Sequence, residues 1–170
     1  MFESVKSEQA GMQEAALHIF SVVPGIFGNS QGNYINVIKE MLAHCLNNTA
    51  NQKVRFAAVK ATVAFLLANE SDTPVLNHFR DLLPAIITGV ADSVQAQDDD
   101  AMLKCLIDLA ENVPKFMRGQ IENVLTLCSK IIGDSDVSDQ WRQLGLEVVV
   151  TLSETAPAMV RKFGRSEERR

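Results

Sequence analysis

The chain has 170 residues, 46% of them hydrophobic and only 6% aromatic, and a net charge of −5. This length and hydrophobic content suffice for one packed domain, but no predicted helix carries a Lys/Arg run, so the sequence lacks the footprint of a nucleic-acid-binding protein. No stretch approaches the roughly 18 uninterrupted apolar residues of a membrane helix and the N-terminus lacks a signal-peptide pattern, so we expect no nucleic-acid partner, no membrane partner and an intracellular chain.

The apolar pattern predicts helices and no strands. We expect seven helices, with ends uncertain by a few residues, at about 10–23, 33–47, 52–69, 75–92, 100–113, 119–133 and 139–156. Pro84 falls inside the fourth helix, where its ring would clash with the preceding turn, so the helix either kinks or starts afresh there. After Pro157 a helical pattern begins again and stops at Lys162.

Three of these segments repeat one another. They begin at Tyr34, Phe79 and Ile121 and align without gaps, at offsets of 45 and 42 residues. Their apolar positions recur on one face of a helix, which we assign to the core. These positions are Tyr34, Val37, Ile38, Met41 and Cys45, then Phe79, Leu82, Leu83, Ile86 and Val90, then Ile121, Val124, Leu125, Cys128 and Ile132.

A second apolar column lies in the helices between these segments. Counting back five residues from Pro24, Glu70, Pro114 and Pro157 gives Ile19, Phe65, Leu109 and Leu152. Each period thus holds a first helix, a short turn and a second helix. Two helices in about 40–47 residues is the length of a HEAT or armadillo unit. The predicted fold is therefore all-α, an α-α superhelix (solenoid) of about three and a half HEAT repeats.

Both ends of the chain fall inside a repeat. We expect residues 1–163 to form the solenoid segment, with incomplete repeats at both ends, and residues 164–170, which have no apolar side chain, to form a disordered polar tail. Without neighbouring repeats, apolar side chains near the two ends should be partly exposed. The expected ones are Ile19, Phe20, Val148, Val149 and Leu152.

The sequence offers no constellation for catalysis. The three histidines, His18, His44 and His78, are dispersed and lack metal-ligand spacing, and no phosphate-binding loop or nucleophile elbow is present. We therefore predict no enzymatic activity, no catalytic or metal-binding residue and no cofactor.

Two further groups of residues have structural interpretations. Cys45, Cys105 and Cys128 form no closely spaced pair and lie in apolar columns, so we expect buried free thiols. The acidic run before the fifth helix is expected to cap that helix through Asp99 or Asp100. The alternative, a divalent-cation site, would need a wider set of oxygen ligands.

The outward positions of the second helices align into polar columns. A rotation of 100° per residue points these positions away from the core face. The repeat alignment then places Asn36, Asp81 and Asn123 in one column, Ala43, Thr88 and Lys130 in another, and Asn47, Asp92 and Asp134 in a third. Stripes of this kind form the extended binding surface of repeat proteins. The candidate protein-binding residues are Asn36, Lys39, Glu40, Asp81, Thr88, Asn123 and Lys130. The alternatives are that such residues only hydrate the helix surface, and that the third column accepts hydrogen bonds from neighbouring turns.

Four blocks, at residues 16–29, 78–93, 98–116 and 143–162, resemble the importin-β family in order along the chain. The second reads HFRDLLPAIITGVADS from His78 to Ser93, and the resemblance covers about residues 2–162. That family comprises long HEAT solenoids that carry cargo through nuclear pores and release it on binding Ran in its GTP form.

The resemblance implies a segment of a nuclear import receptor that binds protein cargo, Ran-GTP or both. The implied partners are protein cargo with basic import signals, the Ran GTPase through a longer parent protein, and nuclear pore proteins. The implied localisation is shuttling between cytoplasm and nucleus. The alternative is a HEAT scaffold subunit that mediates assembly without a transport role, because a fold does not dictate a function.

Overall fold

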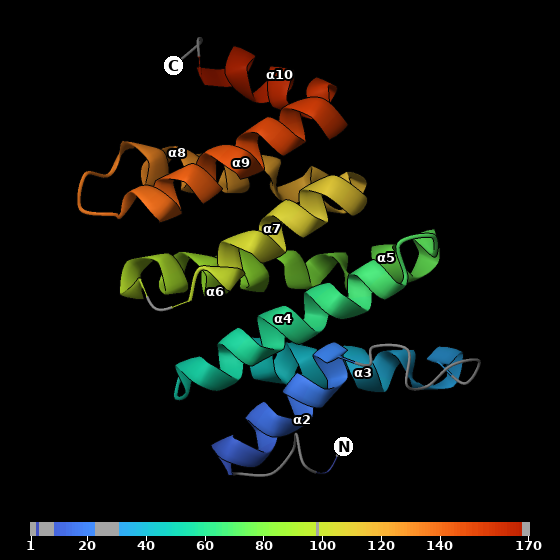
Figure 1. The fold of residues 1–170 in the computed structure, drawn as a ribbon. Helices are drawn as coiled ribbons and strands as arrows, with labels where there is room; N and C mark the ends of the chain where they lie inside the picture. Colours follow the sequence, from blue (N-terminus) through green and yellow to red (C-terminus); the bar gives the residue numbers. More distant parts are fainter. Residues whose placement is uncertain (1–2, 4–8, 23–30, 98, 168–170) are drawn as a thin grey trace. The chain divides into compact units, whose positions relative to one another are not determined.

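The computed structural model describes residues 3, 9–22, 31–97 and 99–167 (Figure 1). The elements are α2 (Ala10–Val22), α3 (Gln31–Leu46), α4 (Gln52–Ala68), α5 (Thr73–Phe79), the 3₁₀ helix η2 (Arg80–Leu82), α6 (Leu83–Ala96), α7 (Ala101–Asn112), the 3₁₀ helix η3 (Pro114–Gln120), α8 (Ile121–Gly133), α9 (Asp139–Thr155) and α10 (Pro157–Glu167). The described part contains no strand, and the all-α prediction is confirmed. None of its helices combines the length and apolarity that crossing a bilayer requires.

The expected fourth helix is divided, and Pro84 marks the division. The segment runs as α5, then the 3₁₀ turn η2, then α6, which starts at Leu83 and so places Pro84 at its second residue. A proline fits the first turn of a helix because its fixed φ is helical and its missing N–H has no partner there. Of the two predicted outcomes, a fresh start is therefore the one observed.

Helix α10 differs from the sequence-based expectation. It begins at Pro157 and continues to Glu167, so it includes the first four residues, 164–167, of the predicted disordered tail. Arg, Ser and Glu tolerate a helix, and extending an existing helix costs far less than starting one. The end of the predicted tail, residues 168–170, lies outside the described residues.

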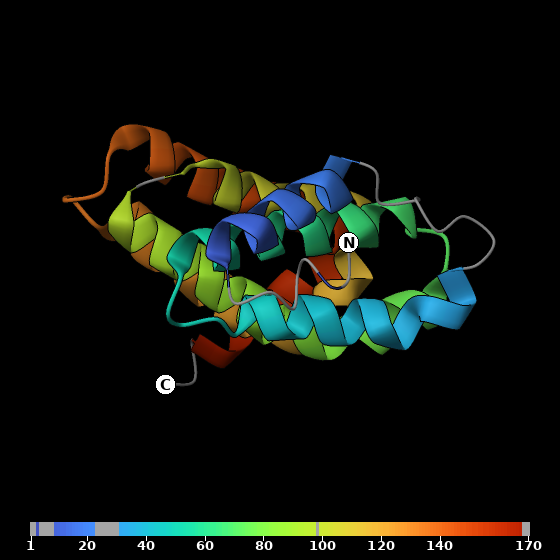
Figure 2. The same cartoon turned by 90° about the horizontal axis from the view of Figure 1, so that it is seen from below.

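The chain divides into two compact units, Met1–Gly89 and Val90–Arg170, and the division falls inside α6. In the first unit, α4 packs against α2 on one side and against α3 on the other (Figures 1 and 2). Three aromatic rings join these helices. The Phe20 and Phe65 rings are stacked with centroids 5.8 Å apart, and the Phe65 and Phe79 centroids are 4.9 Å apart. Phe65 is therefore the centre of this core.

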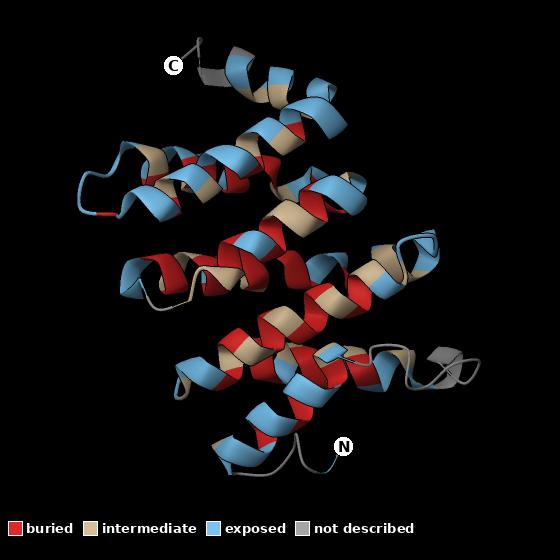
Figure 3. Ribbon diagram, in the orientation of Figure 1, coloured by how far each residue is buried: buried red, intermediate tan, exposed pale blue. Residues whose placement is uncertain are grey.

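In the second unit, α9 packs against both α7 and α8, and η3 contacts α7 and α8. Helix α10 packs against α9 and α8. The first helix of one pair thus lies on the first helix of the next, and the second on the second, as the repeat predicts. Buried residues concentrate on the helix faces that meet inside each unit, and exposed residues on the opposite faces (Figure 3).

The column of first helices is confirmed at three of its four positions. Phe65, Leu109 and Leu152 are fully buried, whereas Ile19 is 53% exposed. In α2 the fully buried residue is Phe20, which stacks on Phe65. The correct offset between the first two repeats is therefore 45 residues. Our offset of 46 counts back from Pro24, which lies outside the described residues.

The column of second helices needs one correction. The predicted core residues of the second and third segments are buried, except for Ile132, which is half-buried next to the buried Ile131. In α3, however, Tyr34 is 43% exposed and Val37 is 37% exposed. The buried residues of α3 lie toward its C-terminal end, at Ile38, Met41, Leu42, Cys45 and Leu46. The apolar period shows which face of a helix is turned toward the core, but it does not show how much of the helix length the neighbouring helices cover.

The expected exposure at the two ends is correct for Ile19 but wrong for Phe20, Val148 and Leu152, which are buried, while Val149 is half-buried. Neighbouring helices of the same unit cover these positions, since α2 packs on α4, and α9 packs on α7, α8 and α10. The large apolar side chains that are exposed on these helices lie on other faces. They are Met12, Ile19 and Val22 on α2 and Leu146 and Val150 on α9.

Gly89 permits a close approach between α6 and α4. A Cβ atom at Gly89 would lie 2.8 Å from Cγ2 of Val59, a short branched side chain that cannot swing away. We expect Gly89→Ala to lower the free energy of unfolding by about 1 kcal/mol, because overpacking outweighs the gain in helix propensity. In a Val59→Ala background the same change should stabilise the chain. Equal effects in both backgrounds, measured by urea unfolding, would contradict this contact.

The three cysteines are free and buried, as predicted. Burial raises the pKa of the Cys45 thiol from 9.0 to about 11 and that of Cys128 to about 12. Above pH 9 the unfolded chain therefore loses thiol protons that the folded chain keeps. The stability that these thiols contribute is complete below that pH and is lost as the pH rises toward 11 and 12.

This shift predicts a pH-dependent substitution effect. The cost of Cys128→Ala in free energy of unfolding should be smaller at about pH 10 than at about pH 8, by about 1 kcal/mol. Comparing each variant with the wild-type chain at the same pH removes the titration of all other groups. An identical cost at the two pH values would show that the thiol ionises equally in both states.

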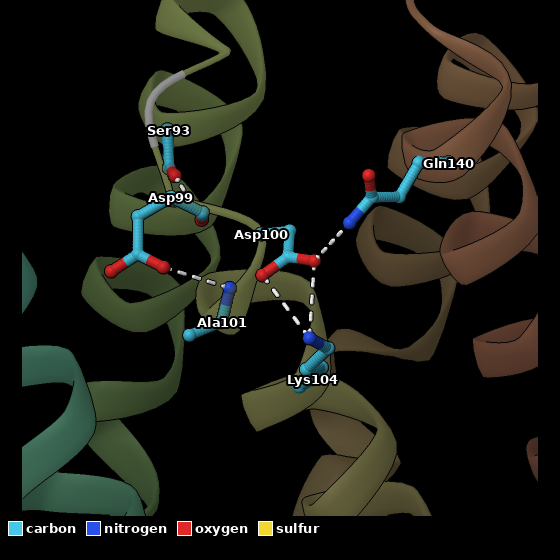
Figure 4. Close-up of polar contacts among 6 residues, drawn as sticks. All are labelled: Ser93, Asp99, Asp100, Ala101, Lys104 and Gln140. Carbon is cyan, nitrogen blue, oxygen red and sulfur yellow. Dashed lines mark hydrogen bonds and ion pairs between the residues drawn. The ribbon is translucent and has the colours of Figure 1, made fainter.

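The connection between α6 and α7 is held by its acidic residues (Figure 4). Asp99 Oδ1 accepts a hydrogen bond from the backbone N–H of Ala101 at 3.0 Å, and the Ser93 hydroxyl donates to the Asp99 carbonyl at 2.9 Å. Asp99 thus satisfies a free N–H group at the start of α7, and that part of the capping prediction is confirmed.

Asp100 and Gln97 link this connection to the start of α9. The Asp100 carboxylate pairs with Lys104 at 3.0 Å and accepts a hydrogen bond from the Gln140 amide (Figure 4). Gln97 has a φ of 48°, in the left-handed region, and its side chain donates to the Asp136 carbonyl at 3.1 Å. These contacts offset the strain of that backbone conformation and hold the two connections together.

Candidate protein-binding surface

Five of the seven candidate residues lie in the first unit, on second helices. Asn36, Lys39 and Glu40 come from α3, Asp81 from η2 and Thr88 from α6. The Lys39 Nζ atom lies 2.8 Å from Asp81 Oδ2, so the structure brings the first two polar segments together. Because the Asp81 side chain is 66% exposed, this ion pair contributes at most about 1 kcal/mol, and its main effect is to orient the two side chains.

The other candidates of this unit differ in their freedom to bind. The side chains of Asn36 and Glu40 are exposed and form no hydrogen bond or ion pair with any described residue. Thr88 is also exposed, but its hydroxyl donates to the Pro84 carbonyl at 3.0 Å within the same helix. Asn36 and Glu40 are therefore the side chains best placed to contact a partner.

Asn123 and Lys130 lie on α8 in the second unit, and both are exposed. The Asn123 amide donates to the Gln120 side chain just before the helix, which fixes its orientation. Lys130 lies in the last turn of α8, where the helix dipole favours a cation. Each unit thus exposes some of the candidate residues.

The structural alternative for the third column is that its side chains accept hydrogen bonds from neighbouring turns, and the bonds of Asp134 and Asn47 test it. Asp134 Oδ1 accepts a hydrogen bond from the backbone N–H of Asp136 at 2.9 Å, and so caps the turn after α8. Asn47 instead donates its amide to the Ala43 carbonyl at 2.8 Å, one turn back in its own helix. Asp134 is therefore an acceptor within its own turn and Asn47 is a donor, and neither of these two hydrogen bonds reaches a neighbouring turn.

The described residues contain no group of three His, Cys, Asp or Glu side chains that could hold a metal ion. The three histidines are exposed and lie on separate helices. Burial, and then the negative charge of Glu111, raise the pKa of Asp108 above its usual range. Asp108 lies on α7.

One feature of the second unit does not follow from the sequence pattern. A cavity of about 520 Å³ lies between α10 and the junction of η3 with α8, and Arg118, Asn123 and Lys162 are among its lining residues. We had treated residues 157–162 as an unfinished pattern and so placed no charged side chain there. The spacing of 43 residues between Pro114 and Pro157, each at the start of a second helix, was the available signal.

Two family models match the chain. The model described as IPO5-like, TPR repeats matches residues 1–127, and one described as an importin repeat matches residues 134–167. A curated relative, importin subunit beta-3 of Saccharomyces cerevisiae, is 25% identical over 162 residues, which are 94% of this chain and 14% of the relative. The chain therefore spans about a seventh of that relative's length.

Solved structures of the karyopherin Kap121p match as well. Kap121p alone is 25% identical with a TM-score of 0.76, over 95% of this chain and 15% of Kap121p. Kap121p bound to Pho4p gives 25% and 0.75, over 93% and 15% of the two chains. Kap121p bound to RanGTP gives 23% and 0.71, over 92% and 14%.

These matches settle the class of repeat. The first family description names TPR repeats, but the period of 42–46 residues in this chain exceeds the roughly 34 of a TPR unit. The fold is that of the HEAT-repeat karyopherin solenoids, which confirms the predicted fold class. From its sequence match over most of its length and from this fold, the chain belongs to the IPO5-like family of importin-β transport receptors.

Proposed function

We propose that the chain is a segment of a nuclear import receptor that binds protein cargo, Ran-GTP or both, non-covalently, through the exposed face of its second helices. The family match over residues 1–127 is the observation that carries this proposal. The complexes of Kap121p with Pho4p and with RanGTP support both partner classes. Because the family consists of transport receptors, it favours a non-enzymatic role and disfavours a scaffold without a transport role.

The charge of the candidate surface supports a basic cargo. In the first unit the candidate residues include the exposed carboxylates Glu40 and Asp81 and a single cation, Lys39, which pairs with Asp81, so Glu40 leaves this part of the surface with a net negative charge. The whole chain carries a net charge of −5. Complementary charge of this kind speeds association and selects the partner. Cargo with a basic import signal therefore fits this surface. Nuclear pore proteins are a further proposed partner class, and the proposed localisation is shuttling between cytoplasm and nucleus.

Charge reversal tests the proposal. Isothermal titration of the chain with a Lys-rich cargo peptide and with GTP-loaded Ran, using GDP-loaded Ran as the reference, should detect binding of at least one partner. Glu40→Lys and Asp81→Lys should weaken binding of the basic peptide about tenfold, which is about 1.4 kcal/mol. The matched control is Glu154→Lys, an exposed residue of α9, a first helix.

The control should bind as the wild-type chain does, and circular dichroism should show that all three variants stay folded. A folded chain that binds neither Ran-GTP nor the basic peptide would contradict the proposal and favour the non-transport scaffold. Equal losses in Glu154→Lys and Asp81→Lys would show that overall charge, and not the second-helix face, governs binding.

A further inference from the structure

The second unit contains a cleft that the proposed cargo surface does not explain. Its volume is about 520 Å³, within the range of about 300–1,000 Å³ typical of ligand sites. One wall is the junction of η3 and α8, from Arg118 to Asn123, and the other is one face of α10. The α10 residues that line this cleft, hereafter the α8–α10 cleft, are Ala158, Met159, Lys162 and Phe163.

Two cations face the cleft from opposite walls. Arg118 comes from η3 and Lys162 from α10, and both are exposed without a hydrogen bond or ion pair to any described residue. The only acidic residue among the lining residues is Glu122, also exposed. In a chain whose net charge is −5, this local excess of positive charge is unusual and favours an anionic group.

The remaining lining residues supply apolar and hydrogen-bonding surface. Ile121 is buried, and Met159 and Phe163 are half-buried, so together they offer apolar contact area within the cleft. The side-chain amides of Gln120 and Asn123, which bond to each other, retain further donor and acceptor capacity. A peptide uses both kinds of surface, because its backbone needs hydrogen-bond partners and its apolar side chains need apolar contacts. A small inorganic anion would leave the apolar surface unused.

We propose that the α8–α10 cleft binds a short peptide segment of a partner protein that carries an acidic side chain beside a large apolar one. The carboxylate pairs with Arg118 and Lys162, and Arg118 can hold it with two parallel hydrogen bonds. The apolar side chain packs on Met159 and Phe163. This occupant has the opposite charge to a basic import signal, so the cleft is a second kind of site, although it shares Asn123 with the proposed cargo surface.

A nucleic acid is the alternative occupant, and the lining residues disfavour it. Nucleic-acid sites track several phosphates with a row of cations, whereas this cleft has two cations and one carboxylate. Glu122 would repel a second phosphate, while a single carboxylate can pair with Arg118 and Lys162 and avoid Glu122. The charge pattern therefore favours a ligand with few negative charges over one with a row of phosphates.

Fluorescence anisotropy with three labelled probes tests the inference. They are the peptide Ser-Glu-Phe-Asp-Leu-Ser, its charge-reversed form Ser-Lys-Phe-Lys-Leu-Ser, and oligouridylate. The acidic peptide should bind the wild-type chain, and Arg118→Glu and Lys162→Glu should each weaken it about tenfold. Glu122→Gln should strengthen it about two- to threefold, because a repulsive charge is removed.

The matched control is Lys53→Glu, an exposed cation on α4 in the first unit, which should leave binding of the acidic peptide unchanged. The inference is overturned if the charge-reversed peptide binds as well, if the acidic peptide shows no saturable binding, or if oligouridylate binds more tightly and depends on Arg118 and Lys162. Arg118→Glu should leave the affinities for the basic cargo peptide and for Ran-GTP unchanged. A failure of the cleft proposal can therefore be distinguished from a failure of the proposed function.

Discussion

Replacing Phe65 with alanine is expected to lower the free energy of unfolding of the first unit by about 3–5 kcal/mol. Phe65 is fully buried on α4, and its ring contacts Phe20 of α2 and Phe79 at the end of α5. Alanine would leave a cavity bounded by both rings and would remove both aromatic contacts. The two neighbours belong to separate helices, so neither can close the cavity without moving its helix.

Urea unfolding followed by far-UV circular dichroism measures this effect, with native-state hydrogen exchange of the α4 amides as a local check. Ile19→Ala is the control, because that side chain is 53% exposed on α2, and it should cost less than about 1 kcal/mol. A cost for Phe65→Ala as small as that of the control would show that the three rings do not form a packed core.

Leu109→Ala is expected to lower the free energy of unfolding of the second unit by about 2–5 kcal/mol. Leu109 is fully buried on α7, the helix that packs against α9. It occupies the same column as Phe65 in the preceding repeat, so both substitutions test the repeat assignment itself. Similar losses in the two units are what a periodic core predicts.

Leu146→Ala provides a matched control in the same unit, since Leu146 lies on α9 but is 51% exposed. The chemical change is identical and the helix propensities of the two sites are alike, so the difference in cost measures burial alone. We expect Leu146→Ala to cost less than about 1 kcal/mol in urea unfolding. If the two substitutions cost the same, the column assignment is wrong for the second unit.

The sequence predicted the repeated core well where one helix face recurs over several periods. The buried column through Phe65, Leu109 and Leu152 follows from apolar spacing alone, because each helix has the same neighbours as its counterpart one repeat away. The register of α2 was wrong by one residue because it was anchored on a proline outside the described residues. The exposure of Tyr34 and Val37 depends on where the covering helices end, which a period cannot give.

The candidate surface was predictable only as a set of outward positions. Helical rotation correctly placed Asn36, Glu40 and Asp81 on the exposed side. The ion pair between Lys39 and Asp81 depends on how two helices 42 residues apart in sequence lie against each other, and no local pattern encodes that. The α8–α10 cleft was missed for the same reason, since it exists only where the second helices of consecutive pairs meet.

Hydrogen–deuterium exchange of the chain, free and in the presence of GTP-loaded Ran or the basic cargo peptide, tests most directly whether binding uses the second helices. We expect a bound partner to slow exchange of amides in α3, α6 and α8 and to leave exchange in α4, α7 and α9 unchanged. Slower exchange confined to α4, α7 and α9 would place the partner on the first helices and contradict the account.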